Sequence, residues 1–90
     1  MNQRLTTAEL LNLEDVLGSL LFARRAGDLG RLALLAYCDV RRWARWAHRD
    51  ALAESAADLI TKQPFPSRAD FLSSVDDLIT ELEHIRSGQH

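Results

Sequence analysis

The chain has 90 residues, of which 47% are hydrophobic and 27% are charged, and its formal net charge is −2. This length allows a single domain spanning residues 1–90, and the apolar fraction excludes an intrinsically disordered chain. A chain of this size buries only about 60–65% of its unfolded surface, so we do not expect a large enclosed active site.

Cysteine content and apolar runs indicate the cellular setting. The single cysteine, Cys38, cannot form a disulfide within the chain, and the N-terminus lacks the charged leader and apolar block of a signal peptide. The longest apolar runs are a few residues, far below the ~20 that a membrane span needs. We therefore expect a cytoplasmic protein without membrane contact.

The first expected helix covers about residues 7–26. Thr6 followed by Glu9 is the pattern of a capping box, and Gly27 is a typical residue just beyond a helix end. The apolar residues that share one stripe at helical spacing are Leu10, Leu13, Val16, Leu17, Leu20 and Leu21. Gly18 lies in the middle of this helix, where its small size would allow another helix to cross closely, so we expect such a crossing there.

The second and third expected helices cover about residues 29–48 and 51–63. Asp28 is the expected N-cap of the second, and Trp43 lies on its apolar stripe, so we expect this tryptophan in the core. The apolar stripe of the third would point about 180° away from the Trp43 face if the helix continued unbroken. We therefore expect a break near His48, Arg49 and Asp50, with Asp50 capping the new helix; one long helix that changes partners is the alternative.

The fourth expected helix covers about residues 67–86, after a turn forced by Pro64 and Pro66. Ser67 followed by Asp70 is a second capping pattern. The four segments predict an all-α fold, a small four-helix bundle or a related helical array, completed by dimerisation.

Charge divides the chain into a basic and an acidic part. Residues 24–49 hold seven arginines and two aspartates, whereas residues 50–84 hold eight acids and two bases. The arginines that form the candidate basic face are Arg41, Arg42, Arg45 and Arg49. This face either binds nucleic acid or pairs with the acids of residues 50–84 of the same chain or of a second subunit. The mildly acidic net charge favours the second interpretation.

The sequence holds no convincing catalytic, cofactor or metal motif. Glu81 and His84 have the Glu-x-x-His spacing of helical metal sites, but no second such motif accompanies them, so we expect a solvated face. Cys38 has no evident base beside it, and we expect it to pack as a small apolar residue rather than to act as a nucleophile. We expect no enzyme activity.

Apolar residues outnumber what one buried stripe per helix requires. The side chains outside or at the edge of the main stripes are Leu11, Phe22, Leu34, Leu35 and Trp46. A monomer of this length would expose several of them, which indicates an interface. We therefore expect a non-enzymatic protein-binding module, first of all a homodimer, acting as a regulator, adaptor or chaperone-like accessory factor. The alternative is a nucleic-acid-associated regulator that uses the candidate basic face.

Overall fold

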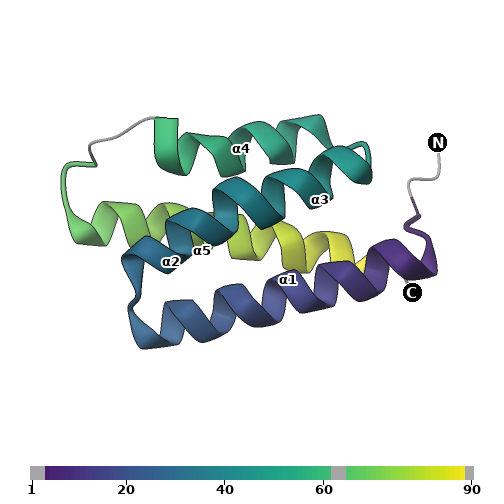
Figure 1. The fold of residues 1–90 in the computed structure, drawn as a ribbon, viewed down its shortest axis with the longest axis horizontal. Coiled ribbons are helices and arrows are strands. Elements are labelled where there is room, and N and C mark those ends of the chain that lie inside the picture. Colours follow the sequence, from purple (N-terminus) through teal and green to yellow (C-terminus); the bar gives the residue numbers. More distant parts are fainter. Residues whose placement is uncertain (1–3, 62–64, 89–90) are drawn as a thin grey trace.

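The computed structural model describes residues 4–61 and 65–88, and these residues form helices and no strand. Along the chain the elements are α1 (Thr7–Ala26), α2 (Leu29–Leu34), the π-helical turn η1 (Leu35–Val40), α3 (Arg41–Trp46), α4 (Asp50–Thr61) and α5 (Arg68–Ser87) (Figure 1). Residues 29–46 run on without a break as one helix, here called the α2–α3 helix. The predicted all-helical fold with four helices is thus confirmed. The expected end of the third helix at Gln63, and the effect of Pro64, fall outside the described residues.

The helix starts follow the predicted capping residues. The backbone N–H of Glu9 donates to Thr6 Oγ1 at 3.1 Å and the N–H of Thr6 donates to Glu9 Oε1 at 2.9 Å, which completes the capping box of α1. Asp28 accepts from the N–H of Arg31 at 3.1 Å at the start of α2. Ser67 Oγ accepts in the same way at the start of α5, from the N–H of Asp70 at 3.1 Å. Each cap satisfies a backbone donor that has no partner within its own helix.

Two helix ends use the same hydrogen-bond pattern. After α1, the N–H of Gly27 and of the next residue donate back to the carbonyls of residues 24 and 23, and Gly27 has a left-handed φ of 69°. After α3, His48 and Arg49 repeat this Schellman pattern, with a φ of 60° at His48. The left-handed residue turns the chain back, which confirms the predicted break. Asp50, however, is the first residue of α4 rather than its N-cap.

The π-helical turn within the α2–α3 helix is a feature that the sequence did not predict. Buried residues recur every four positions through this turn and on both sides of it, at Leu32, Ala36, Val40 and Ala44. In a regular α-helix of 3.6 residues per turn, such a stripe would drift by about 40° at each step. The wider turn at η1, in which the N–H of Arg41 donates to the carbonyl of Ala36, reduces this drift and keeps the stripe directed at the core.

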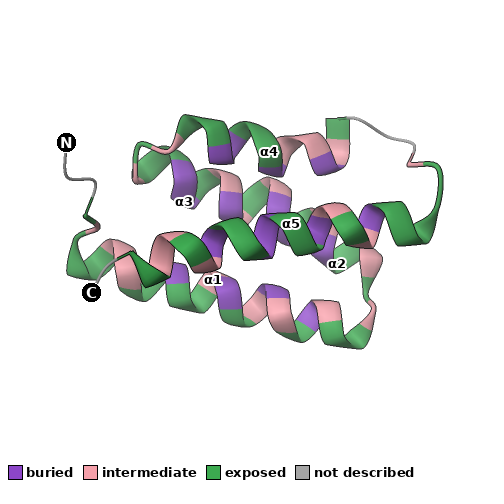
Figure 2. Ribbon diagram, turned by 180° about the vertical axis from the view of Figure 1, so that it is seen from behind, coloured by how far each residue is buried: buried purple, intermediate pink, exposed green. Residues whose placement is uncertain are grey.

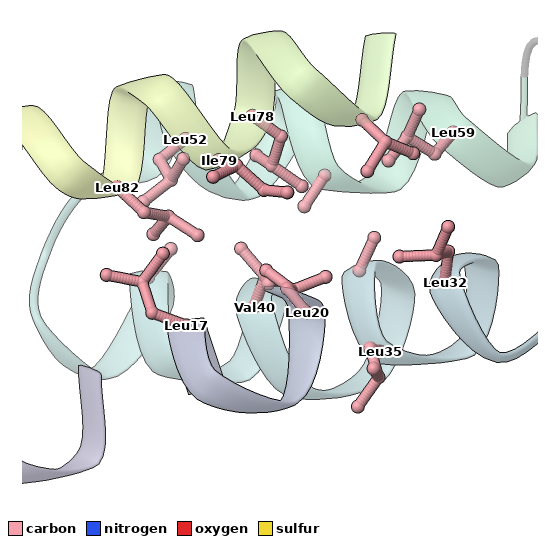
Figure 3. Packing of buried hydrophobic residues seen from close by; sticks show 14 of the residues in the cluster. Leu17, Leu20, Leu32, Leu35, Val40, Leu52, Leu59, Leu78, Ile79 and Leu82 are labelled. Carbon is pink, nitrogen blue, oxygen red and sulfur yellow. The ribbon is translucent and has the colours of Figure 1, made fainter. Parts of the chain in front are cut away.

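The four helices surround one apolar core. α1 packs against α5 and the α2–α3 helix, and α4 packs against the α2–α3 helix and α5. Each helix has a buried side and an exposed side (Figure 2). In the interior, Leu17 and Leu20 of α1 lie opposite Leu78 and Leu82 of α5 (Figure 3). This arrangement is a four-helix bundle, and its broadest view measures 38 by 23 Å.

Trp43 and Gly18 test two expectations from the sequence, a buried tryptophan and a close helix crossing. Trp43 is 4% exposed and belongs to the core, as predicted. Gly18, in contrast, is exposed, and a Cβ added there would meet no atom within 4 Å, so no helix of the described chain crosses closely at that point.

No helix among the described residues combines the length and the apolar character that a bilayer span requires.

Candidate interaction face

Large hydrophobic side chains are exposed on only one part of the described surface. Leu11 and Phe22 of α1 are 62% and 72% exposed, and Leu34 and Trp46 of the α2–α3 helix are 64% and 48% exposed. The large apolar residues that the structure describes on α4 and α5 are buried or half-buried. We call the exposed surface of α1 and the α2–α3 helix that carries these four side chains the α1/α2–α3 face. Its two helices lie side by side in Figure 1.

Leu35 departs from the expectation that placed it with these four residues. It is only 8% exposed and packs as part of the core, on the π-helical turn. Leu35 follows the buried Leu32 by three positions, so the two side chains are neighbours on the helix and pack into the core together. Leu35 therefore stabilises the fold of the single chain and is not an exposed apolar residue.

A groove runs along the α1/α2–α3 face between the two helices. It has a volume of about 550 Å³ and is lined by Asn12, Asp15, Val16 and Ser19 from α1 and by Asp39, Arg42, Trp43 and Trp46 from the other helix. A second hollow continues along the same seam, lined by Glu14, Asp15, Gly18, Ser19, Phe22 and Arg31. Asp15 and Ser19 line both hollows, so the two hollows are adjacent. Trp46 lines the first hollow and Phe22 lines the second.

The exposed apolar residues lie close to these lining residues along each helix. Leu11, Asp15 and Phe22 are spaced at i, i+4 and i+11, so they share one side of α1. Leu34 follows Arg31 by three positions, and such residues are neighbours on a helix surface. Phe22 and Trp46 thus line the seam itself, and Leu11 and Leu34 lie about one turn from residues that line it, whereas single apolar residues scattered over the bundle would need no explanation.

Charge differs between the two sides of the seam. The α1 side carries the carboxylates of Glu14 and Asp15, and the α2–α3 side carries the guanidinium groups of Arg31 and Arg42 together with the carboxylate of Asp39. Arg42 also pairs with Asp39 one turn earlier at 3.2 Å, but its side chain remains 78% exposed. Sequence reasoning missed Asp15 and Arg31 as members of this face. Helical spacing could have identified them, because Asp15 precedes Phe22 by seven residues and Arg31 precedes Leu34 by three, which places each pair on one side of its helix.

The candidate basic face is divided in the structure. The guanidinium group of Arg41 lies 4.2 Å from the centre of the Tyr37 ring, and its Nε donates to the Tyr37 carbonyl at 3.1 Å. Arg42 is paired with Asp39, Arg45 is exposed, and Arg49 is half-buried at the turn before α4. Arg41 and Arg42 are therefore held by neighbours on their own helix, and the acids of residues 50–84 do not hold them.

An ion pair between α1 and α5 joins the basic and acidic parts of the chain. Arg24 near the end of α1 binds both carboxylate oxygens of Asp76 on α5, at 2.8 and 3.2 Å. The hydrogen bonds from Arg24 lower the pKa of Asp76 below its ordinary value of 3.8, and the attraction of the opposite charge acts in the same direction. This pair lies on the side where α1 meets α5, away from the seam.

The residues considered for chemistry are dispersed. Cys38 is exposed, in contrast to the expectation that it packs as a small apolar residue. Glu81 and His84 are exposed on α5, as expected for a solvated face. Within residues 4–61 and 65–88, no three side chains of the types that bind metals come together as a possible site.

No family model matches this chain, and neither a curated protein nor a solved structure shows significant similarity to it. The fold and the α1/α2–α3 face define a small four-helix protein whose exposed large apolar side chains, among the described residues, lie on α1 and the α2–α3 helix.

Proposed function

We propose that this chain is a non-enzymatic protein-binding module whose first interaction is the formation of a homodimer through the α1/α2–α3 face. The observation that carries the proposal is the gathering of the exposed large hydrophobic side chains around one seam, with none on the described parts of α4 and α5. Exposed apolar patches rimmed by polar groups are typical of protein interfaces. Trp46 is the best candidate for an energetic hot spot, because tryptophan is enriched among such residues.

The role that fits such a module is that of a small regulator, adaptor or chaperone-like accessory factor in the cytoplasm. An exposed, unpaired thiol such as that of Cys38 is stable in a reducing compartment. A two-fold dimer supports the same role, because each copy keeps its α4 and α5 surfaces available for a further partner.

The test is sedimentation equilibrium over a range of chain concentrations, with Phe22→Gln and Trp46→Gln compared with the unmodified chain. Each substitution removes an apolar side chain whose burial contributes about 1.5–3 kcal/mol, and a two-fold interface loses it twice. We expect the dissociation constant to rise by roughly two orders of magnitude or more in each variant. Ala51→Gln, at an exposed position of α4, is the matched control and keeps the dimer. A single species near 10.2 kDa at high micromolar concentration of the unmodified chain contradicts homodimerisation.

The second candidate function is nucleic-acid binding by Arg41, Arg42, Arg45 and Arg49, with Trp46 available for base stacking. The exposed side chains of Arg42, Arg45 and Trp46 lie within two turns of one another, which favours this candidate. The net charge of −2 and the partners that Arg41 has on its own helix count against it, so protein binding is the function that we favour.

A further inference from the structure

We infer that the two copies pair about a two-fold axis that lies in the interface and runs parallel to the helices, so that α1 of each copy packs on the α2–α3 helix of the other. In this arrangement Asp15 of one copy lies opposite Arg42 of the second copy, and the same contact occurs twice. The inference rests on the proposed homodimer and specifies how its surfaces meet.

The levels of the residues along the bundle support this pairing. The groove is lined by residues between 12 and 19 of α1 and between 39 and 46 of the other helix, and Asp15 and Arg42 lie near the middle of these two stretches. Phe22 and Arg31 likewise share the second hollow, which places them together further along. A two-fold axis parallel to the helices places α1 of one copy over the α2–α3 helix of the other. It leaves the position of every residue along the helix direction unchanged. Asp15 of α1 is then brought opposite the second copy's Arg42.

The apolar residues are matched by the same operation. Phe22 is at the level of Arg31 and therefore meets the region of the second copy that contains Leu34, three residues further along the helix. Leu11 lies one turn before Asp15 and meets the region of Trp46, one turn beyond Arg42. Each helix thus offers two apolar side chains that flank a charged one, and the partner helix offers the complementary charge.

The alternative two-fold arrangement of this face would bring like charges together across the interface. An axis perpendicular to the helices would pack α1 on α1 and the α2–α3 helix on its own copy. The helix that carries Glu14 and Asp15 would then face its own copy with the same two carboxylates, and the helix that carries Arg31 and Arg42 would face its own copy with the same two arginines. Like charges that meet in an interface oppose association, so the parallel axis is favoured.

The experiment is a charge exchange between two variants, Asp15→Arg and Arg42→Asp. Neither side chain is buried in the core, so the fold of each copy is retained, which circular dichroism verifies. Alone, each variant places like charges opposite each other at both contacts, and we expect its dissociation constant to rise about tenfold or more. In an equimolar mixture the two variants form a heterodimer in which one contact regains opposite charges in reversed order and the other keeps its original type. Native mass spectrometry identifies this heterodimer, because the two variants differ in mass, and sedimentation equilibrium measures its stability.

Two further chains complete the design. The double variant Asp15→Arg/Arg42→Asp also restores opposite charges at both contacts, so we expect it to dimerise alone to within a few-fold of the unmodified chain. Glu54→Arg makes the same change of charge at an exposed position of α4 and leaves the dimer unchanged.

The outcomes separate this inference from the proposed function. If the unmodified chain dimerises and Phe22→Gln prevents it, but the mixture and the double variant do not recover dimers, the pairing is overturned and the homodimer stands. The pairing is also overturned, and the homodimer again stands, if the two single variants dimerise like the unmodified chain. If the unmodified chain stays monomeric at high micromolar concentration, both proposals are overturned.

Discussion

The indole N–H of Trp43 donates a hydrogen bond of 2.9 Å to the carbonyl oxygen of Glu9, and so ties α3 to the first turn of α1. The two residues are 34 positions apart in the chain. Because Trp43 is also buried in the core, one side chain contributes both apolar packing and a directional contact between helices.

Trp43→Phe is expected to destabilise the bundle by about 2 kcal/mol, since it removes this hydrogen bond and leaves part of the indole volume empty. Trp46→Phe is the matched control, because Trp46 is half exposed, and its effect on the single chain stays within about 0.5 kcal/mol. Urea unfolding followed by circular dichroism at sub-micromolar chain concentration, where association contributes least, measures both. Equal effects of the two substitutions would contradict the assigned role of Trp43.

The ion pair between Arg24 and Asp76 predicts a pH-dependent contribution to stability. The pKa of Asp76 is lowered in the folded chain, so the stabilisation is fully present above the ordinary value of 3.8 and is lost as the pH falls through the lowered pKa. Asp76→Asn should therefore be less stable than the unmodified chain at neutral pH, and the difference should vanish in strong acid.

Unfolding measurements of both chains across the acidic range check this prediction. High salt is expected to reduce the difference at neutral pH, because both side chains are partly exposed to solvent. Arg24→Gln in the Asp76→Asn background should add no further pH dependence in this range. A difference that persists at low pH would show that Asp76 acts through something other than its charge.

The two Schellman helix ends provide a matched pair of substitutions. Gly27→Ala is expected to lower the free energy of unfolding by about 1–2 kcal/mol, because the left-handed conformation disfavours a Cβ. An added Cβ would in addition lie 2.8 Å from a guanidinium nitrogen of Arg68. His48→Gly is expected to have the opposite sign, a gain of up to about 1 kcal/mol, because His48 adopts a left-handed φ that glycine tolerates better. Thermal and urea unfolding test both; a loss of stability in His48→Gly would contradict the assigned strain.

Nucleic-acid binding is tested by a gel-shift titration at low salt with duplex and single-stranded probes. We expect no shifted band at micromolar chain concentration, because the net charge is −2 and Arg41 and Arg42 have partners on their own helix. A shift that disappears in Arg42→Glu and Arg45→Glu variants would assign the chain to the alternative function. A shift that persists in them would exclude these arginines as its cause.

The positions of the helix starts followed from local chemistry. Thr6, Asp28 and Ser67 each precede a helix and accept a hydrogen bond from the backbone N–H three residues later. The turn before α4 was predictable from the phase of the apolar stripes on its two sides. These features depend on neighbours within a few residues, so the sequence alone is sufficient to find them.

The candidate interaction face was only partly predictable. Leu11, Phe22, Leu34 and Trp46 were expected at an interface and are exposed, while the interface itself stays a prediction. Leu35 was misplaced, since its side chain is buried in the core of the single chain. The π-helical turn at residues 35–40 was not predicted either, because no residue type marks such a turn; its residues pack against α1 and α4.

The amino-acid sequence by itself determined that this protein is helical, where its helices begin and which stripe of each helix is apolar, because capping and periodicity are local properties. Only the tertiary structure decided which helices are neighbours, and therefore that the exposed apolar residues surround one seam with Asp15 on one side and Arg42 on the other. The spatial relation of two helices depends on how their side chains fit together, and that fit is a property of the packed bundle.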